Sequence, residues 1–106
     1  MQRLTLVRYA AKPEREAENE ALSRAVFAEL REAAPPHIAY ALLRNGREFV
    51  HVFINTAADE SAALTELPSF KRYQQDVGAR CEAPPEVIRL SLQLVDSYGL
   101  PAAAAG

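Results

Sequence analysis

Residues 38–54 constrain the fold more than any other part of the chain, because Asn45 and Gly46 stand there between two apolar runs. An Asn-Gly pair in this setting is the strongest short-range signal for a tight β-hairpin. We therefore expect two antiparallel strands joined by a two-residue loop. The length of that loop fixes how the two strands pair.

A loop made of Asn45 and Gly46 predicts that Arg44 lies opposite Arg47 at the hairpin tip, where like charges need solvent or a bound anion. Counting back along both strands makes Tyr40 the cross-strand neighbour of His51. One face of the hairpin then carries aromatic side chains and a histidine. The other face carries small and aliphatic residues, namely Ala39, Ala41, Leu43, Val50, Val52 and Ile54. Both faces are apolar, so both must be covered.

A chain of 106 residues forms one domain, and a small domain whose sheet needs cover on two faces is expected to find the second cover in another subunit. We predict one domain over residues 1–98 and a short flexible tail over residues 99–106, because that tail is rich in alanine and too short to fold alone. The expected assembly is a homodimer formed through the sheet faces.

Composition excludes several classes of function. Hydrophobic residues make up 49% of the chain, charged residues 25%, and the net charge is -2, which argues against a nucleic-acid or anionic-membrane partner. No apolar run approaches the roughly 18 residues of a membrane helix, and no signal-peptide pattern is present, so we expect a cytoplasmic protein.

Cys81 is the only cysteine, so the sequence offers neither an internal disulfide nor a paired-cysteine zinc site. It falls at helical spacing with other apolar residues, which predicts a small hydrophobe at the inner edge of a helix. A reactive thiol is the alternative and would need an electropositive setting. The acidic side chains of the first helix have no histidine or cysteine among them, so we expect no metal and no cofactor.

The remaining elements follow from periodicity and from proline positions. We predict a strand over residues 3–10, a helix over about 14–34 that ends at Pro35 and Pro36, a second helix ending near Cys81, and a strand over 86–97. Strand, helix, strand, strand, helix, strand is the order of the split βαβ, or ferredoxin-like, arrangement. The fold class is thus α+β, with a four-stranded antiparallel sheet and two helices on one face.

Three segments carry a resemblance to a known family. They are residues 4–9 with the following Lys12 and Pro13, residues 49–55, and residues 59–73. In these segments the chain resembles the antibiotic-biosynthesis-monooxygenase-like group of dimeric α+β-barrel proteins. The resemblance implies two open sheets paired into one barrel. It also implies chemistry such as cofactor-free oxygenation of phenolic polyketides, haem degradation, quinol oxygenation or isomerisation of small molecules.

The absence of tryptophan argues against haem degradation, because the haem-degrading members of the group use one in their pockets. The resemblance thus implies a protein that binds a small apolar or aromatic molecule and acts on it as an oxidoreductase without metal or flavin. A cofactor-free isomerase is one alternative. A non-catalytic dimeric binding or assembly module is the other.

His51 is the main candidate for catalysis, because the unperturbed pKa of histidine lies near neutrality and allows it to act as a base. Tyr40 and Asn55 would position the substrate, Asn55 as a donor to developing oxyanion charge. Tyr73 and Arg8, together with Tyr9, are candidates for lining the pocket. A structural histidine at the core or interface is the alternative for His51, and a surface ion pair is the alternative for Arg8.

The face that carries His51 decides between these interpretations. The last strand alternates Ile88, Leu90 and Leu92 with polar residues, which predicts that its leucine side lies under the helices. On the hairpin, the aliphatic side is the better match to a helix, which would turn His51 toward the partner subunit. The aromatic side could equally pack against the helices, so the sequence leaves both assignments open.

Overall fold

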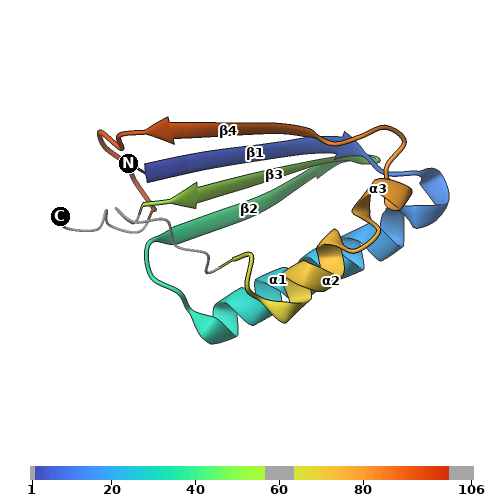
Figure 1. Cartoon of the computed structure of the whole chain (residues 1–106), viewed down its shortest axis with the longest axis horizontal. Helices are drawn as coiled ribbons and strands as arrows, with labels where there is room; N and C mark the ends of the chain where they lie inside the picture. Colours follow the sequence, from blue (N-terminus) through green and yellow to red (C-terminus); the bar gives the residue numbers. More distant parts are fainter. Residues whose placement is uncertain (1, 57–63, 101–106) are drawn as a thin grey trace.

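A four-stranded antiparallel sheet in the order β2-β3-β1-β4 forms one layer of the protein, and helices cover one of its faces (Figure 1). The computed structural model describes residues 2–56 and 64–100. The elements are β1 (Gln2–Ala10), the short 3-10 helix η1 (Pro13–Arg15), α1 (Glu16–Ala33), β2 (Ile38–Asn45), β3 (Glu48–Asn55), α2 (Pro68–Gln74), α3 (Val77–Arg80) and β4 (Glu86–Leu92). The strand order and the helix placement confirm the predicted ferredoxin-like α+β fold.

Helix α1 lies against the sheet through a stripe that contains both polar and apolar residues. Asn19, Ser23 and Val26 are its buried residues and recur at helical spacing. The helix ends where Ala34 adopts a left-handed conformation with φ of 44°, and its backbone N–H donates to the Leu30 carbonyl at 2.7 Å. This end agrees with the stop predicted from the two prolines that follow.

The second predicted helix is broken into two pieces, α2 and α3, so the prediction of one continuous helix was wrong. Gln75 is extended, and Asp76 has φ of 62°, so the backbone leaves helical geometry between the two pieces. The last strand ends at Leu92 and does not continue to residue 97. Periodicity extended both elements too far, because it does not report a single residue that leaves regular backbone geometry.

The hairpin pairs two residues away from the predicted register, so the predicted pairing of Tyr40 with His51 was wrong and Tyr40 lies opposite Phe53. Its loop residues are Gly46 and Arg47, and Asn45 pairs with Glu48. Gly46 has φ of 59°, a conformation that glycine adopts without strain. A shift of two residues keeps every side chain on its predicted face, since sheet faces alternate with period two.

The two arginines at the tip therefore do not lie opposite each other. Arg44 pairs with Phe49 across the hairpin, and its guanidinium reaches Glu16 and Glu20 on α1, with 2.7 Å to the Glu20 carboxylate. Arg47 forms an ion pair with Glu82. Each of the two arginines is thus paired with acidic side chains elsewhere in the fold, and the predicted Arg44–Arg47 repulsion does not arise.

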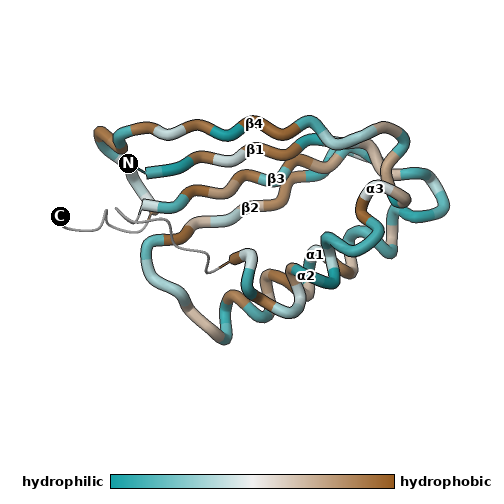
Figure 2. The backbone as a smooth tube through the Cα atoms, in the orientation of Figure 1, coloured by the Kyte–Doolittle hydropathy of each residue, from teal (hydrophilic) through white to brown (hydrophobic). Residues whose placement is uncertain are grey.

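The two faces of the sheet differ sharply in composition. The helix-side face carries Tyr9, Val7, Thr5 and Arg3 of β1 and the residues paired with them, including Phe49, His51, Phe53 and Asn55 of β3. The opposite face, called the outer face below, consists mainly of aliphatic residues, namely Leu4, Leu6, Ala39, Ala41, Leu43, Val50, Val52, Ile54, Ile88, Leu90 and Leu92. Figure 2 shows hydrophobic and more hydrophilic residues following one another along β4.

The leucine side of β4 lies on the outer face, so its predicted position under the helices was wrong. Ile88, Leu90 and Leu92 are 41%, 44% and 47% exposed in the single chain. Val87 and Arg89 take the helix-side positions on this strand, because they pair with Val7 and Thr5. Apolar alternation alone does not say which side the chain's own helices cover.

The predicted domain over residues 1–98 and the tail over residues 99–106 remain predictions. Residues 57–63 and 101–106 lie outside the described residues, and so does the start of the 59–73 segment that supported the family resemblance. None of the helices in the described part of the chain is long and apolar enough to cross a membrane.

Candidate functional site

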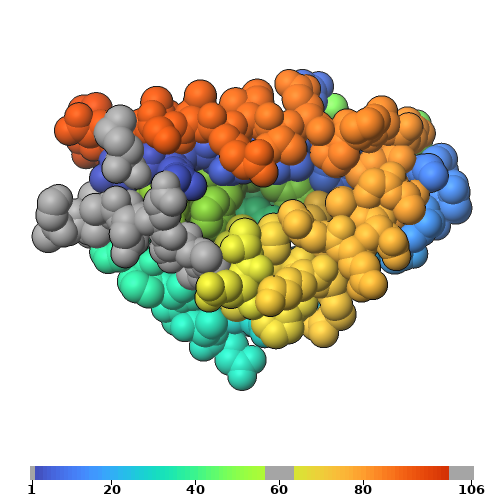
Figure 3. Space-filling model, in the orientation of Figure 1, coloured from blue at the N-terminus to red at the C-terminus, as the bar shows by residue number. Residues whose placement is uncertain are grey.

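A cavity of about 680 Å³ lies between the helix-side face of the sheet and α2. The space-filling view shows it as a hollow bordered by β4 on one side and by α2 on the other (Figure 3). His51, Tyr40 and Tyr73 line it together with apolar side chains such as Phe53 and Phe70. Its volume falls in the range of small-molecule sites, roughly 300–1,000 Å³.

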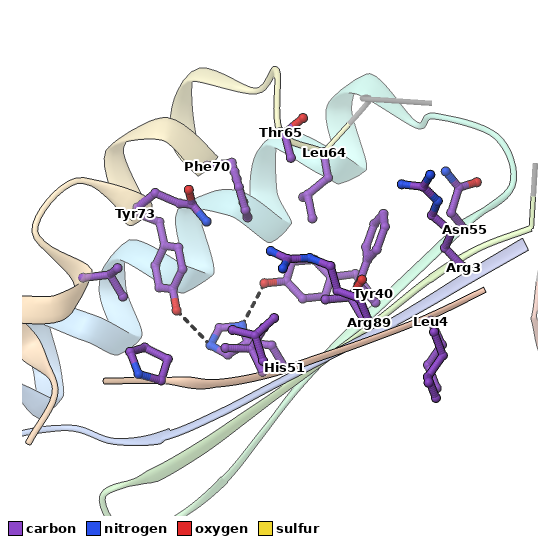
Figure 4. Close-up of a pocket in the computed structure, with 18 of the residues that line it drawn as sticks. Arg3, Leu4, Tyr40, His51, Asn55, Leu64, Thr65, Phe70, Tyr73 and Arg89 are labelled. Atoms are coloured by element: carbon purple, nitrogen blue, oxygen red, sulfur yellow. Dashed lines mark hydrogen bonds between the residues drawn. The ribbon is translucent and has the colours of Figure 1, made fainter. Parts of the chain in front are cut away.

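His51 lies on the helix-side face, 4% exposed, and both of its ring nitrogens are held by tyrosine hydroxyls. The Tyr40 hydroxyl lies 2.8 Å from Nδ1, while the hydroxyls of Tyr9 and Tyr73 lie 2.8 Å and 3.1 Å from Nε2 (Figure 4 draws the Tyr40 and Tyr73 bonds). The Tyr9 and Tyr73 hydroxyls also bond to each other at 2.7 Å. The strands and α2 thus bring three phenols to one imidazole.

Burial keeps this cluster uncharged at neutral pH. Desolvation lowers the pKa of His51 to about 4, so its ring is neutral and offers one donor and one acceptor. Desolvation likewise raises the pKa of each of the three tyrosines, and Tyr9 is the one whose hydrogen bonds from Tyr73 and Asn19 oppose the rise. The imidazole and the three phenols are therefore all neutral at pH 7.

Tyr9 is the junction between this cluster and a second layer of polar residues. Asn19 on α1 donates from Nδ2 to the Tyr9 hydroxyl at 2.8 Å. Arg80 at the end of α3 donates from Nε to Oδ1 of the same Asn19 at 3.0 Å. The amide of Asn19 thus connects a buried cation to the phenol that contacts His51.

Arg80 is 1% exposed and has only uncharged partners among the described residues. Besides Asn19, it donates to the backbone carbonyls of Gln75 and Tyr73, and its guanidinium lies 5.2 Å from the centre of the Tyr73 ring. A buried charge without a carboxylate is costly unless all its donors are used. Arg80 therefore fixes the positions of Tyr73 and Asn19 behind the cluster.

The sequence interpretation missed Asn19 and Arg80. Asn19 and Ser23 stand at the spacing of the buried stripe of α1, where a polar residue signals a buried hydrogen bond. That signal was available in the sequence. Arg80 gave none, because the break between α2 and α3 that turns its side chain inward does not follow from periodicity.

Of the predicted site residues, Tyr40 and Tyr73 lie at His51, and Asn55 lines the same cavity at a distance along the strand, near Arg3 (Figure 4). Tyr9 also lines the cavity. Arg8 is not brought to it. Arg8 lies on the outer face and forms an ion pair with Glu48 at 3.0 Å, which is the alternative that the sequence offered for it.

Cys81 is buried beside Ala11, and burial raises the pKa of its thiol, which disfavours the thiolate form that would react. Its burial agrees with the predicted role as a small hydrophobe, but Cys81 follows α3 in an extended conformation and does not lie in a helix as predicted. The described residues contain no group of three or more histidine, cysteine, aspartate or glutamate side chains placed to hold a metal ion.

No protein-family model matches the chain, and no curated protein matches it in sequence. Several solved structures match it in fold. Rv0793 from Mycobacterium tuberculosis is 20% identical with a TM-score of 0.70, and the match covers 91% of this chain and 100% of that one. A protein from Nitrosomonas europaea, named provisionally as an antibiotic biosynthesis monooxygenase, is 13% identical with a TM-score of 0.72, covering 91% and 94%.

A second Nitrosomonas europaea protein, NE2512, of unknown function, is 22% identical with a TM-score of 0.68 and 96% of each chain covered. The chain has the fold of the antibiotic-biosynthesis-monooxygenase-like proteins. That is the fold the sequence resemblance implied. At these identities the likeness extends to the fold, and the chemistry of the site must be argued from its own residues.

Proposed function

We propose that the protein binds a small aromatic molecule in the His51 cavity and oxidises it without metal or flavin, using His51 as the base. One observation carries the proposal: a neutral histidine, contacted by three phenols, lies at the wall of a cavity of about 680 Å³. Cofactor-free oxygenation needs an electron-rich substrate to lose a proton and react with O₂ itself. The residues must therefore hold the substrate and accept that proton.

Tyr40 offers a route for the proton. With Nε2 protonated and donating toward Tyr9, Nδ1 is free to accept from the Tyr40 hydroxyl at 2.8 Å. A substrate O–H that donates to the Tyr40 oxygen can then pass its proton on as Tyr40 gives its own to Nδ1. The imidazolium that forms lies beside the substrate anion, and this opposite charge raises the pKa of His51 above its value in the empty cavity.

The proposal includes a homodimer formed through the outer face. It is aliphatic across all four strands, and Leu43, Ile88, Leu90 and Leu92 on it are between 41% and 54% exposed in the single chain. An apolar surface that continuous calls for a partner. A second copy paired face to face would cover it and leave the cavity, which opens on the other side of the sheet, inside each subunit.

Oxygen uptake with a hydroxyanthrone, a three-ring electron-rich phenol, tests the enzymatic part. We expect uptake above the uncatalysed rate and a loss of at least about 100-fold in His51→Asn, the range expected for a general base. His37→Asn is the matched control, because His37 is the only other histidine and does not line the cavity. Wild-type uptake equal to the buffer rate would refute the oxygenase.

A non-catalytic binding module is the second candidate, and one observation favours it: no buried side-chain nitrogen or oxygen in the described part of the chain lacks a hydrogen-bond partner. A histidine so fully bonded can be purely structural. In that case His51→Asn would dissociate or unfold the protein rather than only stop turnover. Turnover that persists without oxygen would instead identify a cofactor-free isomerase.

A further inference from the structure

The two ends of the cavity have opposite chemistry. At the inner end lie the uncharged hydroxyls of Tyr9, Tyr40 and Tyr73 around His51. At the outer end lie the guanidinium of Arg3 and the amide of Asn55, while Arg89 extends from β4 over the cavity toward Tyr40 (Figure 4). The described residues that line the cavity include these two arginines and no carboxylate.

The guanidinium of Arg89 has no partner among the described residues. It makes no hydrogen bond or ion pair there, and it stands on the helix-side face opposite Thr5. Its neighbours on β4, Ile88 and Leu90, point to the outer face. A guanidinium placed over an apolar cavity without a counter-charge is suited to a ligand anion, which it can bind through two parallel hydrogen bonds.

The sheet sets the distance between the two ends. His51 pairs with Val7, and Val7 pairs with Val87, two residues before Arg89 on β4. With strands about 4.8 Å apart and about 3.4 Å per residue, the Cα atoms of His51 and Arg89 lie about 12 Å apart. The Arg89 side chain extends from β4 toward Tyr40 and shortens that span, so one small aromatic acid can contact both groups (Figure 4).

We infer that the ligand is an aromatic carboxylate, bound with its hydroxyl or carbonyl oxygen at the His51 cluster and its carboxylate at Arg89. This inference rests on the proposed function, since it assigns the ligand class of the same cavity. The apolar walls between the ends, formed by residues such as Phe53, Phe70 and Val87, fit the ring system. The cationic end selects for acids over neutral phenols of the same shape.

Three fluorescent probes test the inference by direct binding: 6-hydroxy-2-naphthoate, its methyl ester and 2-naphthol. The acid is expected to bind about tenfold more tightly than the ester, as one charge-assisted pair provides. The difference should shrink as salt is raised and should fall below about threefold in Arg89→Gln. Arg31→Gln is the matched control, because Arg31 lies in the last turn of α1 and does not line the cavity.

The outcomes distinguish the carboxylate assignment from the proposed binding of an aromatic molecule in the same cavity. Equal binding of acid and ester, or a preference for the acid that Arg89→Gln leaves unchanged, would overturn the carboxylate assignment while 2-naphthol binding still supported the aromatic site. Failure of all three probes to bind would overturn both. Thermal unfolding of Arg89→Gln at the wild-type temperature would show that any lost binding is local.

Discussion

The two faces of the sheet differ in which side chains they carry and in how far the single chain buries them. On the helix-side face, polar groups are buried deeply and each has partners: His51 is held by three tyrosines, and Arg80 uses its donors on Asn19 and two backbone carbonyls. The outer face is aliphatic and, in the single chain, substantially exposed. A surface with specific polar groups around a cavity suits a ligand, whereas a mainly aliphatic surface suits a second apolar sheet.

Val87 and Ile88 give this comparison at the level of single residues. They are neighbours on β4, both are 41% exposed, and they point to opposite faces. Val87 lines the cavity and Ile88 belongs to the outer face. A substitution that changes one and spares the other therefore separates the two proposed roles.

Ile88→Lys should give the largest effect. A charge buried in a face-to-face dimer has no partner, so we expect the dimer dissociation constant to rise by at least about 100-fold, measured by light scattering over a concentration series. Val87→Lys is the matched control and should stay dimeric while losing affinity for 2-naphthol. The same oligomeric state in both variants and in the wild type would break the comparison.

Arg80→Met tests whether the polar layer behind the cavity stabilises the fold. The substitution leaves Asn19 and the carbonyls of Gln75 and Tyr73 without their donor, so the free energy of unfolding should fall by about 3 kcal/mol in urea titrations. Arg31→Met, at an exposed position, should change it by less than about 0.5 kcal/mol. Equal effects would mean that Arg80 plays no special part.

Acid should destabilise the protein through His51. Burial holds the pKa of His51 at about 4 in the folded state, below the 6.5 of an unfolded chain, so the unfolded state binds the proton more readily. The stability lost between pH 6.5 and pH 4 amounts to about 3 kcal/mol. His51→Gln should flatten this pH dependence, whereas His37→Gln should leave it in place; an unchanged profile in His51→Gln would contradict the burial argument.

Tyr40→Phe should have the smallest effect on the stability of the fold. It removes the hydroxyl that contacts Nδ1 of His51 and keeps the ring that stacks on Phe27 at 4.7 Å, so about 1 kcal/mol of stability should be lost. Tyr98→Phe, at a fully exposed position, is the control and should be neutral. A neutral Tyr40→Phe would place the hydroxyl outside the network.

Much of the fold could be predicted from the sequence because the signals were local. The Asn-Gly hairpin, the stop at Pro35 and Pro36 and the order of elements each follow from a few neighbouring residues. The register was off by two residues because an Asn-Gly pair can occupy more than one position of a loop. The break at Asp76 depends on one left-handed residue and left no periodic signal.

The site was predicted in part, because the sequence did not determine which face of the hairpin lies under the helices. Both sides of the hairpin are apolar, so the pattern could not tell which side the chain's own helices cover. The leucines of β4 pointed to the wrong answer, because the most aliphatic face of this sheet is the outer one. Arg80 lies 61 residues from its partner Asn19, and that contact exists only once the helices have packed.

Methyl NMR with bound 2-naphthol is the most direct test of the division between the two faces. The neighbouring pairs Leu6 and Val7 on β1, and Val87 and Ile88 on β4, each place one methyl-bearing side chain on either face. We predict intermolecular NOEs from the naphthol ring to the methyl groups of Val7 and Val87, and none to those of Leu6 and Ile88. NOEs confined to Leu6 and Ile88 would place the ligand on the outer face and contradict the account.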